Sequence, residues 1–255
     1  MSHATAQAQP AAERDKTAEP NGELLKSRGP MPPPWMLPHC FELIQQTRYE
    51  QARQLLAPIV ADHPGWAKAH FYLGLTYNKE HRHEHARELF KRALELDPQY
   101  HMVRIYCGWS SYLLGRLDES RQMFESYLAV DPDYADAVFA LGLLDFDDDN
   151  LPSARRRYLR AIELAKSGKD ARTEAKARAR LADVYIRTGD LQAAKRELDR
   201  SIQLKPDNEE PYFKLSRVLQ RLGDADGAGA ARQKLEELRR RVEPTRGPSQ
   251  RLPGK

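Results

Sequence analysis

Cysteine is nearly absent from this sequence, because its 255 residues include only Cys40 and Cys107. Two cysteines cannot form the disulfide framework of a small secreted domain, which favours a reducing compartment. No apolar run approaches the roughly 18 residues that a membrane-spanning helix needs. The first residues also lack the basic start and apolar block of a secretory signal. We therefore expect cytoplasmic residence and no association with a membrane.

Signatures of catalysis are missing as well. The sequence has no phosphate-cradling glycine loop, no Ser-His-Asp order and no pair of carboxylates at a catalytic spacing. Cys40 and Cys107 fall inside stretches with helical apolar spacing, where we expect small buried side chains instead of nucleophiles. We predict that the protein is not an enzyme and uses no cofactor, no small-molecule substrate and no resident metal.

Charge is unevenly distributed along the chain, although the net value is only +4. Residues 97–150 contain 3 basic and 11 acidic side chains, a balance of −8. Residues 151–205 contain 15 basic and 7 acidic side chains, a balance of +8. Such runs are usually solvated helix faces, but they also allow a surface with an acidic half and a basic half. Self-association through opposite halves therefore stays open.

A repeat of 34 residues dominates the sequence. Prolines that end successive segments share this spacing, at Pro64, Pro98 and Pro132. The spacing breaks by 6 residues around KSGKDARTEA and then resumes through Ala182 and Pro206. Three other columns hold a small residue, an alanine or serine, and a large apolar residue. Their members are Cys40, Gly74, Gly108 and Gly142; Ala52, Ala86, Ser120 and Ala154; and Leu56, Phe90, Phe124 and Tyr158.

Within each repeat the apolar residues follow helical spacing. AKAHFYLGLTYNK predicts a first helix and HARELFKRALEL a second one, with a short turn between them. Gly115, Gly189 and Gly223 occupy this turn in later repeats, where a positive φ is expected. A proline cannot continue a helix, so the second helix should end before it. Each repeat is thus predicted to be a helical hairpin.

These columns resemble the tetratricopeptide repeat family. The match rests on the small residue in YLGLTY, ALGLLD and RLADVY, the alanine column, the large apolar column and the terminal proline. It covers residues 33–242 as six units that begin near residues 33, 67, 101, 135, 175 and 209. The resemblance implies an all-α solenoid, a right-handed superhelix of hairpins whose first helices line an inner groove. It also implies a non-catalytic adaptor or scaffold that binds a segment of another protein.

The flanking segments differ from the repeats in composition. Residues 1–32 are rich in alanine and proline, and residues 243–255 form a short basic tail. Low apolar content predicts that both are disordered. The folded domain is therefore expected to span residues 33–242.

A histidine-rich segment, HRHEH at residues 81–85, lies in the second unit. A zinc-protease site needs His-Glu-x-x-His on one helix, and this segment lacks the second histidine at that spacing. In register, His81 falls in the turn column with Gly115 and Gly189. We predict a solvated turn and leave incidental metal affinity as an alternative.

The acidic run DFDDDN, residues 145–150, lies at a predicted helix junction. A calcium loop of the helix-loop-helix type needs glycine sixth and glutamate twelfth, where this chain has Asn150 and Arg156. Asp145 also stands where the family usually has an aromatic residue. We expect these carboxylates to stabilise the N-terminus of the next helix and not to bind an ion.

The register also predicts which side chains face the groove. Three columns of the first helices are almost entirely apolar or aromatic. The predicted peptide-binding residues are Leu37, Phe41, Phe71, Leu75, Ile105, Trp109, Tyr112, Phe139, Leu143 and Phe146. Some should pack between repeats, and the others should leave an apolar concave surface for a partner.

After the 6-residue insertion the same wall becomes cationic. Residues predicted to hold carboxylates are Lys176, Arg180, Arg187, Arg217 and Arg221. We therefore expect the partner to be a protein whose peptide or helix carries large apolar anchors and acidic groups. The two-carboxylate clamp by which some family members bind chaperones is not predicted, because Ile105, Trp109 and Ala140 replace its other residues.

Nucleic-acid binding is a weaker alternative, suggested by the basic stretch ARRRYLR. Arg155, Arg156, Arg157 and Arg160 lie on a predicted second helix and should face the convex side. Few aromatic residues accompany these charges, whereas single-stranded nucleic acids usually stack on aromatic rings. Protein binding remains the favoured function.

Overall fold

The computed structural model describes residues 29–242, so the disorder predicted for residues 243–255 and for residues 1–28 lies outside the described residues. Within this range the chain forms twelve α-helices and no strand. They are α1 (Met36–Gln45), α2 (Tyr49–Asp62), α3 (Ala67–Lys79), α4 (His83–Leu96), α5 (Met102–Leu113), α6 (Leu117–Leu128), α7 (Ala135–Asp147), α8 (Leu151–Ser167), α9 (Ala171–Thr188), α10 (Leu191–Leu204), α11 (Glu209–Arg221) and α12 (Ala225–Val242). The predicted all-α solenoid of six consecutive hairpins is confirmed.

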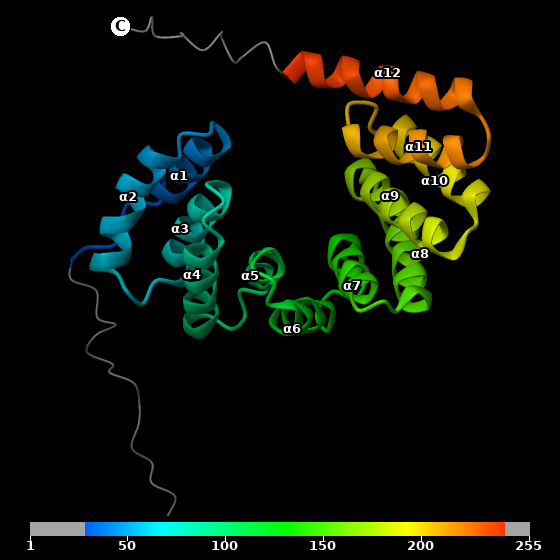
Figure 1. Cartoon of the computed structure of the whole chain (residues 1–255). Helices are drawn as coiled ribbons and strands as arrows, with labels where there is room; N and C mark the ends of the chain where they lie inside the picture. The colour runs from blue at the N-terminus through cyan, green and yellow to red at the C-terminus, as the bar shows by residue number, and fades with distance from the viewer. Residues whose placement is uncertain (1–28, 243–255) are drawn as a thin grey trace, which may run out of the picture.

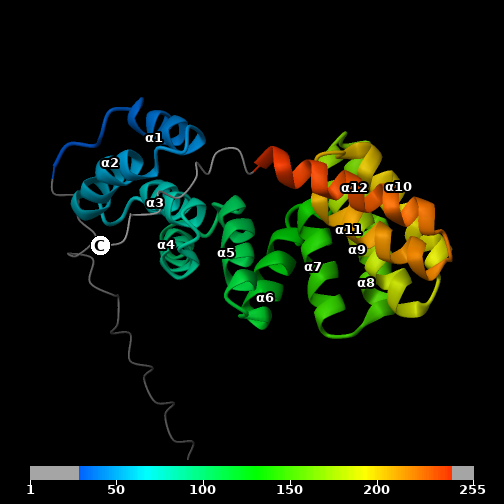
Figure 2. The ribbon, with the colours of Figure 1, turned by 45° about the horizontal axis from the view of Figure 1, so that its top comes forward.

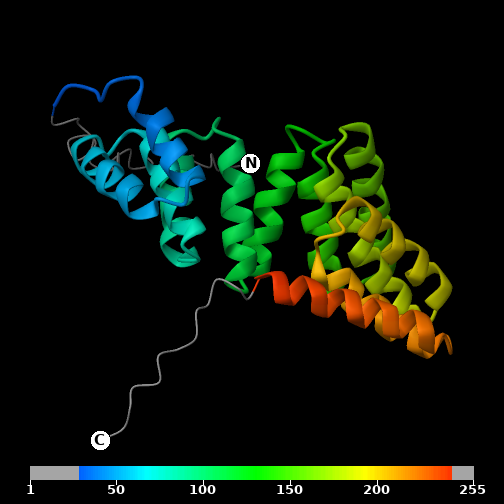
Figure 3. The same ribbon diagram turned by 90° about the horizontal axis from the view of Figure 1, so that it is seen from above.

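The hairpins stack in a curved array (Figure 1). The hairpins α1–α2 and α3–α4 form one limb of an arch, and helices α8 to α12 form the other. Figure 2 shows α5, α6 and α7 side by side between the two limbs, and Figure 3 shows α12 along the edge of the last limb. Each helix packs mainly against its hairpin partner and the neighbouring hairpin. The first helices therefore follow one another along the inner side.

The repeat columns form the interior of each hairpin. The rings of Phe90 and Tyr158 are fully buried on second helices. Gly74 and Gly142 face these rings from the first helices. A Cβ atom on Gly142 would lie 2.7 Å from the Tyr158 ring, which is closer than carbon atoms pack in protein interiors. Glycine in this column thus lets the two helices of a hairpin approach each other.

The 6-residue insertion lengthens two helices. α8 has 17 residues and α9 has 18, compared with 14 and 13 for α4 and α3. Lys166 stands where the first, second, third and fifth repeats have a proline, so α8 continues to Ser167. Asp170 then caps α9 by accepting hydrogen bonds from the backbone of Arg172 and Thr173. The extra residues are therefore helical at both sides of the junction.

The turn column has the backbone conformation predicted for it. Gly115, Gly189 and Gly223 have φ values of 72°, 86° and 81°. His81 has a φ of 60° at the same place, and α4 begins two residues later. The prediction that His81 occupies a turn is confirmed.

Candidate peptide-binding groove

The ten apolar residues predicted for the groove are divided between the core and the concave surface. Trp109, Tyr112 and Phe146 are half-buried, and Phe41 is 41% exposed. The other six are buried, namely Leu37, Phe71, Leu75, Ile105, Phe139 and Leu143. Apart from Phe41 on α1, the accessible rings therefore belong to α5 and α7.

A pocket of about 270 Å³ lies where four first helices meet, and we term it the inner pocket. Its lining residues are Trp109 and Tyr112 on α5, Phe139 and Leu143 on α7, Lys176 and Arg180 on α9, and Asn208 and Glu210 at the start of α11. The first six are residues predicted from the sequence. Asn208 and Glu210 were not predicted, although Glu210 occupies the same position of the repeat as Lys176. Asn208 caps α11 by accepting from the Glu210 backbone N–H at 3.2 Å.

The cations of the inner pocket already face carboxylates. Lys176 Nζ lies 4.0 Å from Asp136 Oδ1, and the Trp109 indole N–H donates to Asp136 Oδ2 at 2.8 Å. Arg180 lies 3.3 Å from Asp183 and 3.5 Å from Glu210. Burial opposes the charge of Arg180, but the carboxylates of Glu210 and Asp183 outweigh it and raise its pKa. A bound carboxylate would have to compete with these groups.

The phenol of Tyr112 at the pocket's edge is neutral at physiological pH. Burial, together with its hydrogen bond to Asp147 at 2.9 Å, raises the pKa of Tyr112 to about 12. The hydroxyl donates to this carboxylate and holds the ring against Trp109, whose centroid is 5.9 Å away at an interplanar angle of 90°. The aromatic wall is therefore held by polar contacts at its outer edge.

A second pocket of about 240 Å³ lies between α9 and α11, and we term it the Phe213 pocket. Its lining residues are Asp183, Ile186, Phe213, Lys214, Arg217, Val218 and Arg221. Phe213 is 47% exposed, and the Arg217 guanidinium lies 5.8 Å from its ring centroid. Lys214 joins the two pockets, because its Nζ lies 2.7 Å from both Asp183 and Glu210. Within residues 29–242, no carboxylate lies within ion-pair distance of Arg217 or Arg221.

Arg187, the remaining predicted carboxylate-binding residue, lines neither pocket. It bonds Asp149 at 2.6 Å, and its guanidinium lies 5.3 Å from the centroid of Phe146. These contacts link α9 to the turn after α7. The sequence could not show that the neighbouring hairpin already supplies a carboxylate to Arg187.

The acidic and basic runs of the chain meet each other within the fold. Four ion pairs join residues 97–150 to residues 151–205. They are Arg157–Asp145 at 2.6 Å, Arg160–Asp133 at 2.6 Å, Lys176–Asp136 at 4.0 Å and Arg187–Asp149 at 2.6 Å. Part of the charge asymmetry is thus balanced inside one chain.

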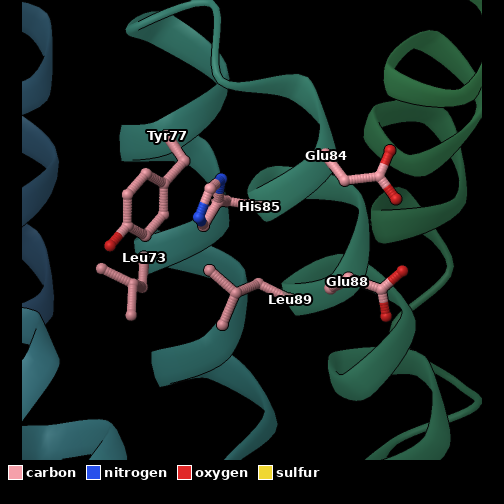
Figure 4. Close-up of a pocket in the computed structure, with 6 residues that line it drawn as sticks. All are labelled: Leu73, Tyr77, Glu84, His85, Glu88 and Leu89. Carbon is pink, nitrogen blue, oxygen red and sulfur yellow. The ribbon is translucent and has the colours of Figure 1, made fainter. Parts of the chain in front are cut away.

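The histidine segment borders a pocket of about 420 Å³ on α3 and α4 (Figure 4). The His85 ring stacks on Tyr77 with centroids 5.2 Å apart. Figure 4 shows Glu84 and Glu88 turned away from these rings, and both carboxylates pair with Arg87. In the part of the chain that the structure describes, no three His, Cys, Asp or Glu residues are grouped to hold a metal ion.

The two cysteines pack inside first helices, as predicted. Both thiols are free and buried. Burial raises the pKa of Cys107 to about 11, so its thiol stays protonated at physiological pH. In addition, none of the helices within residues 29–242 combines the length and the apolar character needed to cross a membrane.

Comparison with known families identifies the repeat. Tetratricopeptide repeat models match residues 67–100, 109–172 and 175–208. The chain therefore belongs to the tetratricopeptide repeat family, whose members generally act as scaffolds for protein–protein interaction and are typically non-catalytic. No curated protein matches the chain in sequence.

Several solved structures share the fold. The Cut9–Hcn1 structure of the APC/C hetero-tetramer has a TM-score of 0.71 and 16% identity, over 80% of this chain and 39% of that chain. PilF of Pseudomonas aeruginosa has a TM-score of 0.67 and 20% identity, over 80% of this chain and 90% of that chain. YrrB, described as a protein of this family with an unusual peptide-binding site, has a TM-score of 0.55 and 16% identity, over 70% of this chain and 89% of that chain. At these identities the similarity concerns the fold alone.

Proposed function

We propose that this protein is an adaptor that holds a segment of another protein in its concave groove, across the inner pocket and the Phe213 pocket. One observation carries the proposal: the inner pocket combines the apolar side chains of Trp109 and Phe139 with the cations Lys176 and Arg180. Aromatic side chains in a partly desolvated pocket are the usual anchors of protein interfaces.

The two pockets define the chemistry of the bound segment. A large apolar side chain fits against Trp109 and Phe139 in the inner pocket. Because Lys176 and Arg180 already face carboxylates, they favour an acidic neighbour but contribute less than free cations would. Arg217 and Arg221 in the Phe213 pocket suit a second acidic residue of the same segment. The partner is thus a peptide or helix with an apolar anchor and flanking carboxylates.

Peptides selected from a random displayed library against the purified chain provide the probe for a test. Trp109→Ala should weaken the binding of the selected peptides by about 2 kcal/mol, because the apolar anchor of the peptide loses one wall of its pocket. Replacing both Arg217 and Arg221 with glutamine should weaken acidic peptides more than the same peptides with amides in place of acids. Isothermal titration calorimetry measures both effects.

The matched control is Arg200→Gln on α10, whose side chain is exposed and bonds Gln203 instead of lining a pocket. It should leave the affinity unchanged. Selected peptides that bind all variants equally, while the helical circular dichroism of each variant is preserved, would exclude the groove as the site.

Nucleic-acid binding has weaker support. Of the four arginines in ARRRYLR, Arg157 and Arg160 bond the carboxylates of Asp145 and Asp133. Only Arg155 and Arg156 are left to meet a phosphate backbone, and two phosphate contacts supply little of the affinity on which such proteins depend.

A further inference from the structure

One position of the repeat carries a basic residue in the first five hairpins. It lies near the start of each second helix, and its members are Arg53, Arg87, Arg121, Arg155 and Lys195. In the first three hairpins this side chain reaches a carboxylate of the next hairpin. The pairs are Arg53–Glu80 at 2.6 Å, Arg87–Glu119 at 2.7 Å, and Arg121 with Asp145 at 2.9 Å and Asp148 at 2.7 Å. We term this series the arginine ladder.

The arginine ladder does not continue between the fourth and fifth hairpins, and Lys195 of the fifth hairpin pairs with Asp199 on its own helix α10. In register, Tyr185 takes the place of Asp145, Thr188 takes the place of Glu80 and Asp148, and Ala193 takes the place of Glu119. None of these three side chains carries a charge. Within residues 29–242, Arg155 accordingly has no carboxylate within ion-pair distance.

One other contact of Arg53 recurs at Arg155, although Arg53 also pairs with Glu50 on its own helix and the fourth hairpin has Pro152 at that position. The guanidinium of Arg53 lies 5.8 Å from the ring centroid of Tyr77, and that of Arg155 lies 5.8 Å from the ring centroid of Tyr185. Tyr77 and Tyr185 occupy the same position of the repeat. The first junction therefore has the arginine, the ring and the carboxylate, whereas the fourth has only the arginine and the ring.

A crevice of about 460 Å³ opens at this interrupted junction. Its lining residues are Leu151, Pro152, Arg155, Arg156, Val184, Tyr185, Thr188 and Asp190. Asp190 is engaged as the cap of α10, where it accepts from the Ala193 backbone N–H at 2.9 Å. The crevice shares no residue with the inner pocket or the Phe213 pocket. It is a separate surface built from α8 and the end of α9.

We propose that this crevice binds an acidic side chain of a partner protein, flanked by an apolar residue. The carboxylate accepts hydrogen bonds from Arg155 and so takes the place that Glu80 has beside Arg53. Arg156, which has no ion-pair partner within residues 29–242, supplies a second cation at the rim, and Tyr185 with Leu151 covers the apolar neighbour. Charge complementarity selects this occupant, because the missing element of the junction is a carboxylate.

The test uses the full chain and two short probes, N-acetyl-Glu-Leu-Leu amide and the same peptide with glutamine in place of glutamate. The acidic peptide should shift the Arg155 Nε–H resonance in a saturable manner. The glutamine peptide should bind at least about tenfold more weakly, since it lacks the charge-assisted hydrogen bond. Similar shifts with both peptides, or no shift with either up to the solubility limit, overturn the proposal.

Two variants test the proposed contact between Arg155 and a carboxylate: one supplies a carboxylate from the chain itself, and the other removes the cation. Thr188→Glu places a carboxylate where Glu80 stands in the first junction, so it should abolish the shift and raise the midpoint of thermal unfolding. Arg155→Gln removes the donor from an exposed position and should also abolish peptide binding. Undiminished binding to Thr188→Glu overturns the proposal, as does a single-stranded oligonucleotide that shifts Arg155 more strongly than the acidic peptide. Trp109→Ala should leave this binding unchanged, which separates it from the groove.

Discussion

Thr47 occupies the turn of the first hairpin with a φ of 60°, in the left-handed region where the third, fifth and sixth hairpins have glycine. A β-branched residue is disfavoured there by about 1–2 kcal/mol. We therefore predict that Thr47→Gly raises the free energy of unfolding by about 1 kcal/mol, measured by urea denaturation. The converse change Gly115→Thr, at a φ of 72°, should lower it by a similar amount. Destabilisation by Thr47→Gly would contradict this account.

His70 should make stability depend on pH. The side chain is buried, and its Nε2 lies 3.0 Å from the carbonyl oxygen of Pro64. Burial lowers the pKa of His70 below its ordinary value of 6.5, so the unfolded chain binds a proton at a higher pH than the folded chain. The contribution of His70 to stability is then complete above pH 6.5, the pKa in the unfolded chain, and is lost as the pH drops below 6.5.

Urea unfolding followed from neutral pH into the acidic range measures this effect. The free energy of unfolding of the wild type should fall with pH, and the slope should be smaller in His70→Gln. Some slope should remain, because burial also lowers the pKa of His83. Equal slopes in the two proteins would show that His70 has no part in the dependence.

At the scale of helices, one buried carboxylate joins α6, α7 and α8. Asp145 on α7 is 5% exposed and accepts hydrogen bonds from Arg121 at 2.9 Å, Ser153 at 2.7 Å and Arg157 at 2.6 Å. Burial opposes its ionisation, but the hydrogen bonds from Ser153 and Arg121 and the charge of Arg157 hold its pKa below the usual range. Asp145 therefore replaces the family's aromatic residue with a polar junction between two hairpins.

We predict that Asp145→Ala lowers the free energy of unfolding by about 2–3 kcal/mol, less than for a fully buried pair because both arginines keep access to water. Stability should again fall with pH, as for His70, but here hydrogen bonds and the charge of Arg157 lower the pKa, whereas burial lowers that of His70. The contribution of Asp145 is present above the unfolded pKa of an aspartate and is lost as the pH falls through its lowered folded value. Denaturation at neutral and acidic pH should show the wild type and variant converging at low pH. A constant difference would argue against the carboxylate.

At the scale of the whole molecule, the ion pairs between the acidic and basic runs bear on self-association. Arg160–Asp133 and Arg187–Asp149 illustrate how the two runs neutralise each other across neighbouring hairpins of one chain. We therefore expect light scattering to give the same molecular mass at low and high salt. A mass that falls on addition of salt would instead support pairing of opposite halves between two molecules.

Most of the fold was predictable because the residues that form the helices and pack them together recur at fixed positions of the repeat. The helix predicted from AKAHFYLGLTYNK is α3, with the same bounds. The glycine column predicted close packing, which Gly142 and Tyr158 show. The start of α9 was not predicted, since it begins at Ala171, four residues before the start at 175 expected for the fifth unit. There the cap Asp170 and the missing proline decide the boundary, and neither follows the repeat.

The candidate site was predictable in part. Register placed Trp109, Phe139, Lys176 and Arg180 on one wall, and these four line the inner pocket. It could not separate the buried Phe139 from the half-buried Trp109, because exposure depends on how closely adjacent first helices approach. The columns also omitted Glu210, whose carboxylate competes for Arg180.

Periodicity by itself determined the family, the order of the hairpins and the positions that face inward, because these features follow from residues close together in the chain. Only the tertiary structure decided which inward side chains remain accessible and which charges already have partners. Both outcomes depend on distances between neighbouring hairpins, which no local pattern contains. Arg155 looks like Arg53 in the sequence, and only the residues across its junction show that its carboxylate is missing.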